Sequence, residues 1–352
     1  MTSIFLRLDG RTVRFTSLSL ERRLDAVVGT FSASLPMDQA ALARPGARAL
    51  VSISGDGDPE NLLVGFVDRV DGRSEPGREG ITITGRDRTA DLADGVQLSA
   101  PTRWENASLL QLARDVALPF GVTVEDFAGA AGMRVTGVAL EPGQPAYRAL
   151  EGAARQHGVL LGTTPDGALA LGAQDVGVAA TALRTGPRGN VAAWGWTSDH
   201  SKRFRRVRVR GQTGGGFGDL TGLQAPESVV EDPEIRGQRE LDVVAQGPID
   251  GEACERLGAW HVSVRRARAF TFDAELPAWR QRVGAPAWRP GLLVEVEVPA
   301  FDAARDLLVS SVRLEFGDAG ERAALGLIRP ETLERDPSRG VDREPAGFGG
   351  LI

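Results

Sequence analysis

The sequence predicts a mainly β protein with an inserted α/β domain and two similar small β-barrel-like domains. Three observations lead to this fold class. Apolar residues alternate with polar ones in short runs such as LVSISG (50–55), as is typical of half-buried strands. Turn formers are abundant, with 44 glycines and 20 prolines in 352 residues. Finally, an internal repeat, described below, indicates that one β unit is used twice.

Residues 1–98 are expected to form the first β-barrel-like domain. Their alternating runs are separated by turn clusters, of which GDGDPEN (55–61) is the clearest. This cluster lacks the spaced ligands and the closing glutamate of an EF-hand, so it predicts a hairpin turn and not a calcium loop. Antiparallel strands joined by tight turns should therefore fill this region.

The stretch ITITGRDRTADLADG (81–95) gathers charged residues at the end of a predicted strand. It could be an active site, but the matching stretch of the repeat, ALGLIRPETLE (324–334), has no aspartates. We therefore interpret the charges structurally. A short helical turn should be capped and polarised by the three carboxylates, which should pair with two arginines at the surface: Asp87, Asp91 and Asp94 with Arg86 and Arg88.

Residues 99–175 are expected to form the α/β insert domain. Leu109, Leu112, Ala113 and Val116 lie at helical spacing after a cap at Asn106 or Ser108, and Gly121 follows as a terminator. A second helix should run from Pro145 to Gly158. The segment VLLGTTPDGALALG (159–172) then predicts a hairpin about a Pro-Asp-Gly turn. His157 lies at a predicted helix end, where the helix dipole favours it, with no catalytic partner in the pattern.

Residues 176–335 are expected to form the second β-barrel-like domain, with a loop-and-helix insertion near 213–268. The glycine-rich TGGGFGDLTG (213–222) matches neither phosphate-binding glycine pattern, so it predicts a flexible loop. Asp250 should cap a following helix, which Ala253, Leu257, Trp260 and Val264 line on one side. Residues 336–352 contain too few apolar residues to pack alone, and we expect a flexible C-terminal tail that orders on binding.

The candidate interaction surface is an arginine-rich strand, RFRRVRVRG (203–211), together with Phe348 of the tail. Alternation places Arg206, Arg208 and Arg210 on one face of the strand. They could meet phosphates or an acidic partner. The favoured interpretation is a solvated face that pairs with acidic neighbours across the sheet.

Composition argues against several functional classes. The single cysteine, Cys254, excludes an internal disulfide, and three separated histidines offer little for zinc, so we expect no cofactor and no metal. A net charge of −6 argues against nucleic-acid binding as the main role. No apolar run approaches a membrane span, and the charged start MTSIFLRLDG is unlike a secretory signal. We expect a cytoplasmically made protein with no membrane partner.

The repeat relates two separated segments. FSASLP (31–36) matches FDAELP (272–277), and Arg44-Pro-Gly46 matches Arg289-Pro-Gly291. The register of the second match carries Leu62-Leu-Val64 onto Leu307-Leu-Val309 and Val67 onto Val312. Ile81 and Ile83 then resemble Leu325 and Leu327 with one residue fewer between. Phe31 and Phe272 should occupy equivalent inward positions of two β units.

Several stretches together resemble the Mu-like contractile-phage baseplate hub proteins, which are related to the hub of T4-like phages. They are ITITGRDRTADLADG (81–95), Trp104 at the start of the insert, PAYRALEGAARQHGVLLGTTPDGALAL (145–171) and WRPGLLVEVEVPAFDAARDLLVSSVRLEF (288–316). The resemblance covers about residues 1–335 and implies no catalytic positions.

What the resemblance implies is a homotrimer in the tail baseplate, assembled in the host cytoplasm. Its partners would be the tail tube or distal tail protein, the central spike and other baseplate proteins. Two β units per chain in a three-fold ring would present six similar units, which suits an adaptor between a six-fold tube and a three-fold spike. DNA would only pass through the ring, and the low basic charge fits that role.

Two alternatives remain. The protein could be the hub of a tail-like particle or secretion apparatus, or a glycan-binding or glycan-cleaving tail protein. The six tryptophans are dispersed, and only Trp194 and Trp196 share a strand face that could stack on a sugar. A buried sheet face explains that pair equally well.

Overall fold

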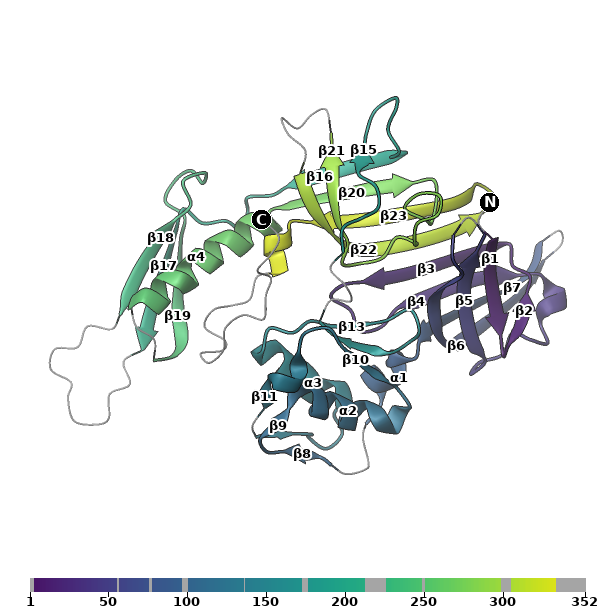
Figure 1. Ribbon diagram of the computed structural model, residues 1–352, viewed down its shortest axis with the longest axis horizontal. Coiled ribbons are helices and arrows are strands. Elements are labelled where there is room, and N and C mark those ends of the chain that lie inside the picture. The colour runs from purple at the N-terminus through teal and green to yellow at the C-terminus, as the bar shows by residue number, and fades with distance from the viewer. Residues whose placement is uncertain are drawn as a thin grey trace. The chain divides into compact units, whose positions relative to one another are not determined.

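The computed structural model describes residues 3–55, 57–75, 78–96, 101–135, 137–172, 177–212, 226–248, 251–298 and 305–333 (Figure 1). The chain forms two compact units. One contains residues 1–194 and 273–327, and the other contains residues 195–272 and 328–352. The mainly β prediction with an inserted helical region is confirmed. The three domain ranges and the barrel-like form of the β domains stay predictions.

The first β unit is built from antiparallel strands that run in the order β3-β4-β7-β6-β5-β1-β2. Their alternating sequences bury one face, with Leu6, Phe31, Ile53 and Ile83 almost fully enclosed. The hairpin predicted at GDGDPEN joins β5 to β6. The strands are β1 (Ser3–Leu8), β2 (Arg11–Val13), β3 (Ser17–Arg23), β4 (Thr30–Leu35), β5 (Arg48–Ser54), β6 (Glu60–Glu75) and β7 (Arg78–Asp87).

The inserted segment packs three helices and short strands around one apolar core. The helices are α1 (Thr89–Asp94), α2 (Leu109–Ala117) and α3 (Ala146–Gln156). Ser108 is the N-cap of α2, since its hydroxyl accepts a hydrogen bond from the Gln111 amide at 3.0 Å. The strands are β8 (Arg103–Trp104), β9 (Ala107–Ser108), β10 (Val124–Asp126), β11 (Arg134–Val135), β12 (Val138–Ala139), β13 (Leu161–Thr163) and β14 (Leu169–Leu171).

These positions agree closely with the pattern in the sequence. The predicted hairpin is the antiparallel pair β13–β14, and Gly167 in its turn has a φ of +79°, which favours glycine. The four apolar residues that predicted α2 are all buried. Gly121 follows α2 and a short 3-10 turn with a φ of +64°.

The second β unit repeats the plan of the first. Its strands are β15 (Leu183–Arg184), β16 (Ala193–Ser198), β20 (Phe270–Leu276), β21 (Leu293–Glu297), β22 (Arg305–Gly317) and β23 (Gly320–Ile328). They run in the order β16-β20-β23-β22, with β21 paired to β22 and β15 to β21. The boundary between the two compact units passes through β16 and β20.

The repeat is visible in burial and in turn geometry. Phe31 is 3% exposed in β4 and Phe272 is 0% exposed in β20, as the repeat predicts. The matched turns agree too, because Gly46 and Gly291 have φ values of +80° and +91°. Each glycine amide donates to a strand carbonyl, that of Val67 at 2.8 Å and that of Val309 at 2.9 Å.

The strand after the turn follows a different register from the one the sequence match indicated. Arg48 lies opposite Phe66, and its counterpart Leu293 lies opposite Leu308. Phe66 therefore corresponds to Leu308, three residues before the residue that the sequence match indicated. Val67 corresponds to Val309 and not to Val312. The predicted register of this strand is wrong because similar apolar runs can match at several offsets.

The corners that join the matched strands differ. Between β4 and β5 the chain makes the exposed 3-10 turn η1 (Met37–Gln39). Between β20 and β21 it buries two tryptophans and an arginine, Trp279, Trp288 and Arg280. Arg280 donates to the Asp58 carbonyl in the β5–β6 turn at 2.9 Å. The second corner is thus bound to the first β unit.

The smaller compact unit contains a three-stranded sheet and a long helix. The sheet runs in the order β18 (Glu227–Glu231), β17 (Arg206–Gln212), β19 (Glu240–Pro248). The helix α4 (Gly251–Arg268) packs against β17 and β18. A short 3-10 turn, η4 (Pro330–Leu333), contacts α4. In the described part of the chain, no helix has both the length and the hydropathy to cross a membrane.

Candidate functional site

The arginine-rich strand β17 forms the charged face that the sequence predicts. Arg206 contacts Glu231 at 3.3 Å and Glu240 at 3.0 Å, because both glutamates lie opposite it on the flanking strands. Arg210 contacts Asp242 at 2.7 Å. Arg208 and Arg210 also reach Glu227 at 3.4 and 3.8 Å. The cations are therefore neutralised within the sheet, as the favoured interpretation expected, and exposed pairs of this kind contribute little to stability.

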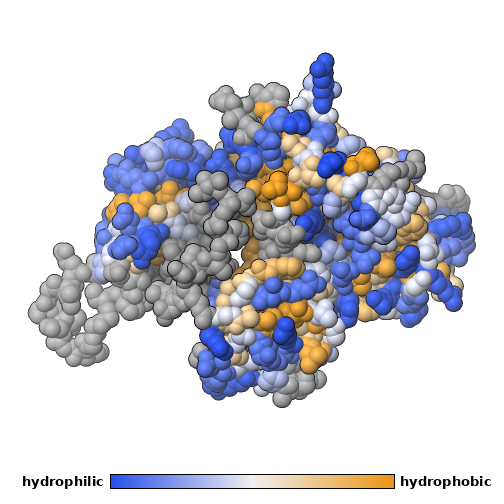
Figure 2. All heavy atoms as spheres, viewed as in Figure 1, coloured by the Kyte–Doolittle hydropathy of each residue, from blue (hydrophilic) through white to orange (hydrophobic). Residues whose placement is uncertain are grey.

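The other face of β17 packs on α4. Val207 and Val209 are buried there with Cys254 and Leu257. Gly258 lies on this face of α4, and a Cβ at that position would come within 2.7 Å of the Val230 side chain. The helix therefore approaches the sheet closely, and Cys254 is a small residue packed between them. Figure 2 shows a band of hydrophobic residues between hydrophilic ones on the visible surface of this part of the chain.

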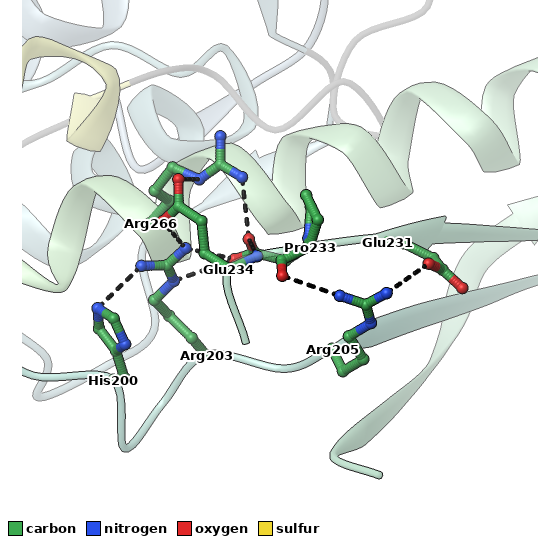
Figure 3. Close-up of polar contacts among 8 residues, drawn as sticks. His200, Arg203, Arg205, Glu231, Pro233, Glu234 and Arg266 are labelled. Carbon is green, nitrogen blue, oxygen red and sulfur yellow. Dashed lines mark hydrogen bonds and ion pairs between the residues drawn. The ribbon is translucent and has the colours of Figure 1, made fainter. Parts of the chain in front are cut away.

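Beside this face lies an ion-pair network that sequence reasoning missed (Figure 3). The Arg203 guanidinium contacts Asp232 at 2.7 Å, and both side chains are almost fully buried. Arg266 of α4 reaches the same carboxylate at 2.9 Å. Burial by itself would raise the pKa of Asp232, but the hydrogen bonds from Arg266 and Arg203 outweigh it and lower this pKa. The network therefore fixes α4 to the loop before β17.

Asp87, at the end of β7, does not lie at the surface as predicted. Its side chain is 3% exposed, and it accepts a hydrogen bond from the Gly29 amide at 2.7 Å. Thr89 Oγ1 lies 2.5 Å from its other oxygen. Burial raises the pKa of Asp87 above its usual value, although these hydrogen bonds oppose the shift. The carboxyl anchors the β7–α1 connection to the segment before β4, and this explains why the strand ends in an aspartate.

The neighbouring charges are structural as well. Arg86 contacts Asp68 at 2.8 Å and Asp94 at 2.7 Å, so its predicted pairing with Asp94 is confirmed. Arg88 instead donates to the Gly121 carbonyl, so its predicted pairing with a carboxylate is wrong. The reason is that Arg88 extends toward the end of α2, where a backbone acceptor is available.

An open groove crosses the faces of β3, β4 and β7, with Glu21 and Asp68 among its lining residues. A general acid would need a carboxyl whose pKa is raised, but each of these carboxylates has an arginine partner. Asp68 pairs with Arg86, and Glu21 pairs with Arg313 at 2.7 Å. The groove therefore has no free acid–base pair among its described residues.

Other chemistry-bearing residues have structural surroundings. His157 Nε2 lies 2.9 Å from the Arg134 carbonyl, which fixes its ring at the end of α3. No group of three or more potential metal ligands occurs among the described residues. Phe348, the 213–222 loop, Asp250 and the 336–352 tail lie outside the described residues. The roles predicted for them stay predictions.

Trp194 and Trp196 share one face of β16, as the alternation predicts. Their side chains are 41% and 49% exposed, so the interpretation as a buried sheet face is wrong. Trp196 also stacks on Phe270 of the neighbouring strand, with ring centroids 6.4 Å apart. Among the described strands β16 is the last of its sheet order, and an exposed tryptophan pair on such a strand is typical of contact surfaces.

The junction between the two β units is a continuous strand pairing. β3 of the first unit lies antiparallel to the second half of β22, from Ser311 opposite Arg23 to Phe316 opposite Leu18. Leu20 and Leu314 face each other in the core, and both are buried. Sequence reasoning missed this junction, because a pairing between distant segments leaves no local signal.

Two family models match the chain. The second domain of the gp44-like baseplate hub proteins matches residues 89–173, and the fourth domain of the Mu phage baseplate assembly protein GpP matches residues 251–336. Both matched families are phage baseplate proteins, so these two parts of the chain are similar to parts of phage-tail proteins.

Whole-chain comparisons agree. Baseplate hub protein gp44 of Escherichia phage Mu is 28% identical over 372 aligned residues, which cover 99% of this chain and 95% of that protein. The 43 kDa tail protein of prophage MuSo2 from Shewanella oneidensis is 25% identical, with a TM-score of 0.76 over 94% of this chain and 99% of that one. A tail protein from Neisseria meningitidis MC58 shares the fold, with a TM-score of 0.75, 20% identity and coverage of 96% and 99% of the two chains. The predicted resemblance is confirmed: over nearly its whole length the chain is similar to the baseplate hub protein of phage Mu.

Proposed function

We propose that the protein is the structural hub of a contractile-tail baseplate, where a homotrimer adapts a six-fold tail tube to a three-fold central spike. The observation that supports the hub role is homology to the phage Mu baseplate hub protein across 99% of the chain. The hub would be part of the tail baseplate, where it contacts the tube or distal tail protein, the spike and other baseplate proteins.

The duplicated β unit supports the adaptor role. Two units that share buried phenylalanines and equivalent glycine turns let three chains present six similar surfaces. The units differ at their corners, so a second surface of the same ring can retain three-fold symmetry. In this proposal DNA only passes through the ring, and the net charge of −6 fits a lumen that does not retain phosphates.

The site chemistry supports a non-enzymatic role. The charged residues of the described groove and of β17 are engaged in ion pairs with one another. Such pairs stabilise an assembly scaffold and provide no group poised for proton transfer.

Native mass measurement of the purified full chain tests the trimer. A trimeric mass at micromolar concentration is expected, and six-fold features should appear in averaged electron micrographs of the ring viewed along its axis. A monomer, both alone and mixed with spike and tube proteins, would contradict the proposal. Sugar release from peptidoglycan should stay at the level of a buffer control, and measurable release would favour the glycan-cleaving alternative.

A further inference from the structure

Each β unit contains a long strand that pairs with its own unit along only the first half of one edge. The second half of that edge is covered in one unit and, among the described strands, open in the other. In the second unit, β22 pairs with β21 through its first half and with β3 through its second half. In the first unit, β6 pairs with β5 only as far as Val67. Beyond it, Arg69–Glu75 pair with β7 on one side, and no described strand covers the other side.

The strand β16 has the complementary open edge. β16 is the counterpart of β3. In the first unit β3 pairs with β4, and in the second unit β16 pairs with β20, the strand that matches β4. β16 ends the strand order, so its outer edge has no neighbour among the described strands. The Ala192 amide donates to the Glu275 carbonyl at 2.8 Å. By alternation from this bond, the backbone groups of Ala193 and Gly195 point to the outer edge. The Asp199 amide donates to the Ala269 carbonyl at 2.8 Å, one residue out of step with the Ala192 bond, so the pairing with β20 shifts by one residue along β16.

The β3–β22 pairing predicts which residues of β16 and β6 would lie opposite each other. Phe31 and Phe272 are equivalent, so Trp194, opposite the residue after Phe272, takes the place of Ser19 in β3. The β22 register places Gly72 at the position of Leu314. Leu314 pairs with Leu20, whose counterpart in β16 is Gly195. The junction repeated between chains therefore sets Gly72 opposite Gly195.

We propose that β16 of one copy pairs antiparallel with the second half of β6 of the next copy, between Arg69–Ser74 and Ala193–Ser198. This inference rests on the proposed trimer and names its contact. The occupant of each edge is a second copy because the chain already joins its own two units by the same pairing. A head-to-tail contact of this kind closes into a ring when its rotation divides a full turn, and the proposed trimer requires such a rotation.

The side chains on the outward faces of these strands are complementary. β6 presents Arg69, Asp71 and Arg73, which are exposed and partly paired along the strand, with Arg69 2.8 Å from Asp71. In the proposed register Arg73 lies across from Trp194, and Asp71 lies across from Trp196. Cross-strand neighbours have Cβ atoms roughly 5 Å apart, and an arginine can lie over an indole face at that spacing.

Disulfide trapping tests the contact. A Cβ at either Gly72 or Gly195 would meet no atom within 4 Å, so cysteines fit both sites, and the only native cysteine is buried. The double variant Gly72→Cys/Gly195→Cys should form linked dimers and trimers on mild oxidation, all of which revert on reduction. A mixture of the two single variants should give linked dimers only.

The matched control is Arg73→Cys/Gly195→Cys, which moves one sulfur to the opposite face of the strand. It should give at least about ten-fold less linked trimer, since a disulfide requires facing Cβ atoms. A second pair, Ser74→Cys/Ala193→Cys, covers the case in which a glycine variant fails to fold.

The outcomes separate this inference from the proposed function. A trimeric native mass without linkage in either matched pair would overturn the β6–β16 contact and leave the hub role intact. Linkage as strong in the control as in the matched pairs would overturn the register and with it the inference. A monomeric mass would overturn both the trimer and the contact.

Discussion

The two β units share a strand frame but differ where the chain turns between matched strands. The first unit closes its corner with an exposed 3-10 turn, whereas the second buries Trp279 and Arg280. The Trp279 indole donates to the Glu315 carbonyl at 2.8 Å, so this corner is fixed to β22. The matched strands are therefore common to both units. The turns between them differ, and so do the contacts that each unit can make there.

Removal of the equivalent phenylalanines tests the shared frame and has the largest expected effect. Phe31→Ala and Phe272→Ala should each lower the free energy of unfolding by about 3–5 kcal/mol, because each deletes a buried aromatic ring. Urea titration followed by circular dichroism measures this. Phe127→Ala, at a position 42% exposed, is the control. If only one of the two buried rings matters, the units do not share a frame.

The corner difference is tested at Arg280. This guanidinium donates to the Ala285 and Asp58 carbonyls, each at 2.9 Å. Arg280→Ala should cost about 1–3 kcal/mol, because buried acceptors lose their donor. Differential scanning calorimetry should show a lower Tm. The neighbouring exposed residue gives the control Arg282→Ala, and an equal loss in both variants would argue against a special role for the second corner.

The end of β7 gives a pH-dependent difference, since the matching stretch ALGLIRPETLE has no aspartate. Its pKa is raised in the folded protein, so the ionised carboxylate lowers stability. This cost is absent below the unfolded-state pKa of about 4 and grows as the pH rises through the folded value. Asp87→Asn should therefore gain stability relative to the native chain between low and neutral pH. Unfolding titrations at several pH values measure this gain, and parallel profiles would contradict it.

The smallest expected effect concerns the ion pair across the junction. Arg313 and Glu21 are 52% and 33% exposed, so Glu21→Gln should cost only about 0.2–1 kcal/mol and less at high salt. The β3–β22 pairing rests on its backbone bonds and buried leucines. Denaturation in low and high salt checks this, with Glu275→Gln as a control for the Arg322–Glu275 pair. A loss comparable to that of Phe31→Ala would mean that the charges hold the junction.

The sequence predicts local features well and long-range ones poorly. The α2 cap at Ser108, the β13–β14 turn and the alternation around Phe31 depend on neighbouring residues, and all three predictions are confirmed. Likewise, the arginines of β17 could be assigned to a paired face because alternation orients them. The junction of β3 with β22 joins residues about three hundred positions apart.

Buried polar residues mark the other limit. Nothing in the sequence separates Asp87 or Asp232 from exposed aspartates, because burial of a carboxylate depends on which donors the fold brings to it. Asp87 was thus expected at the surface. The one usable signal for Asp232 is the cluster of arginines at the end of α4, which could only be interpreted as complementing the helix dipole.

The β3–β22 junction lies within a single polypeptide, and this affects how a ring would form. Strands that are tethered to each other meet at an effective concentration that does not depend on how much protein is present. In the proposed ring, the contact between the two units of one chain is therefore formed when that chain folds. Only the contacts between chains cost translational and rotational freedom on association. The concentration of assembled ring would then depend on the third power of the free protein concentration. A ring of six separate units would depend on the sixth power.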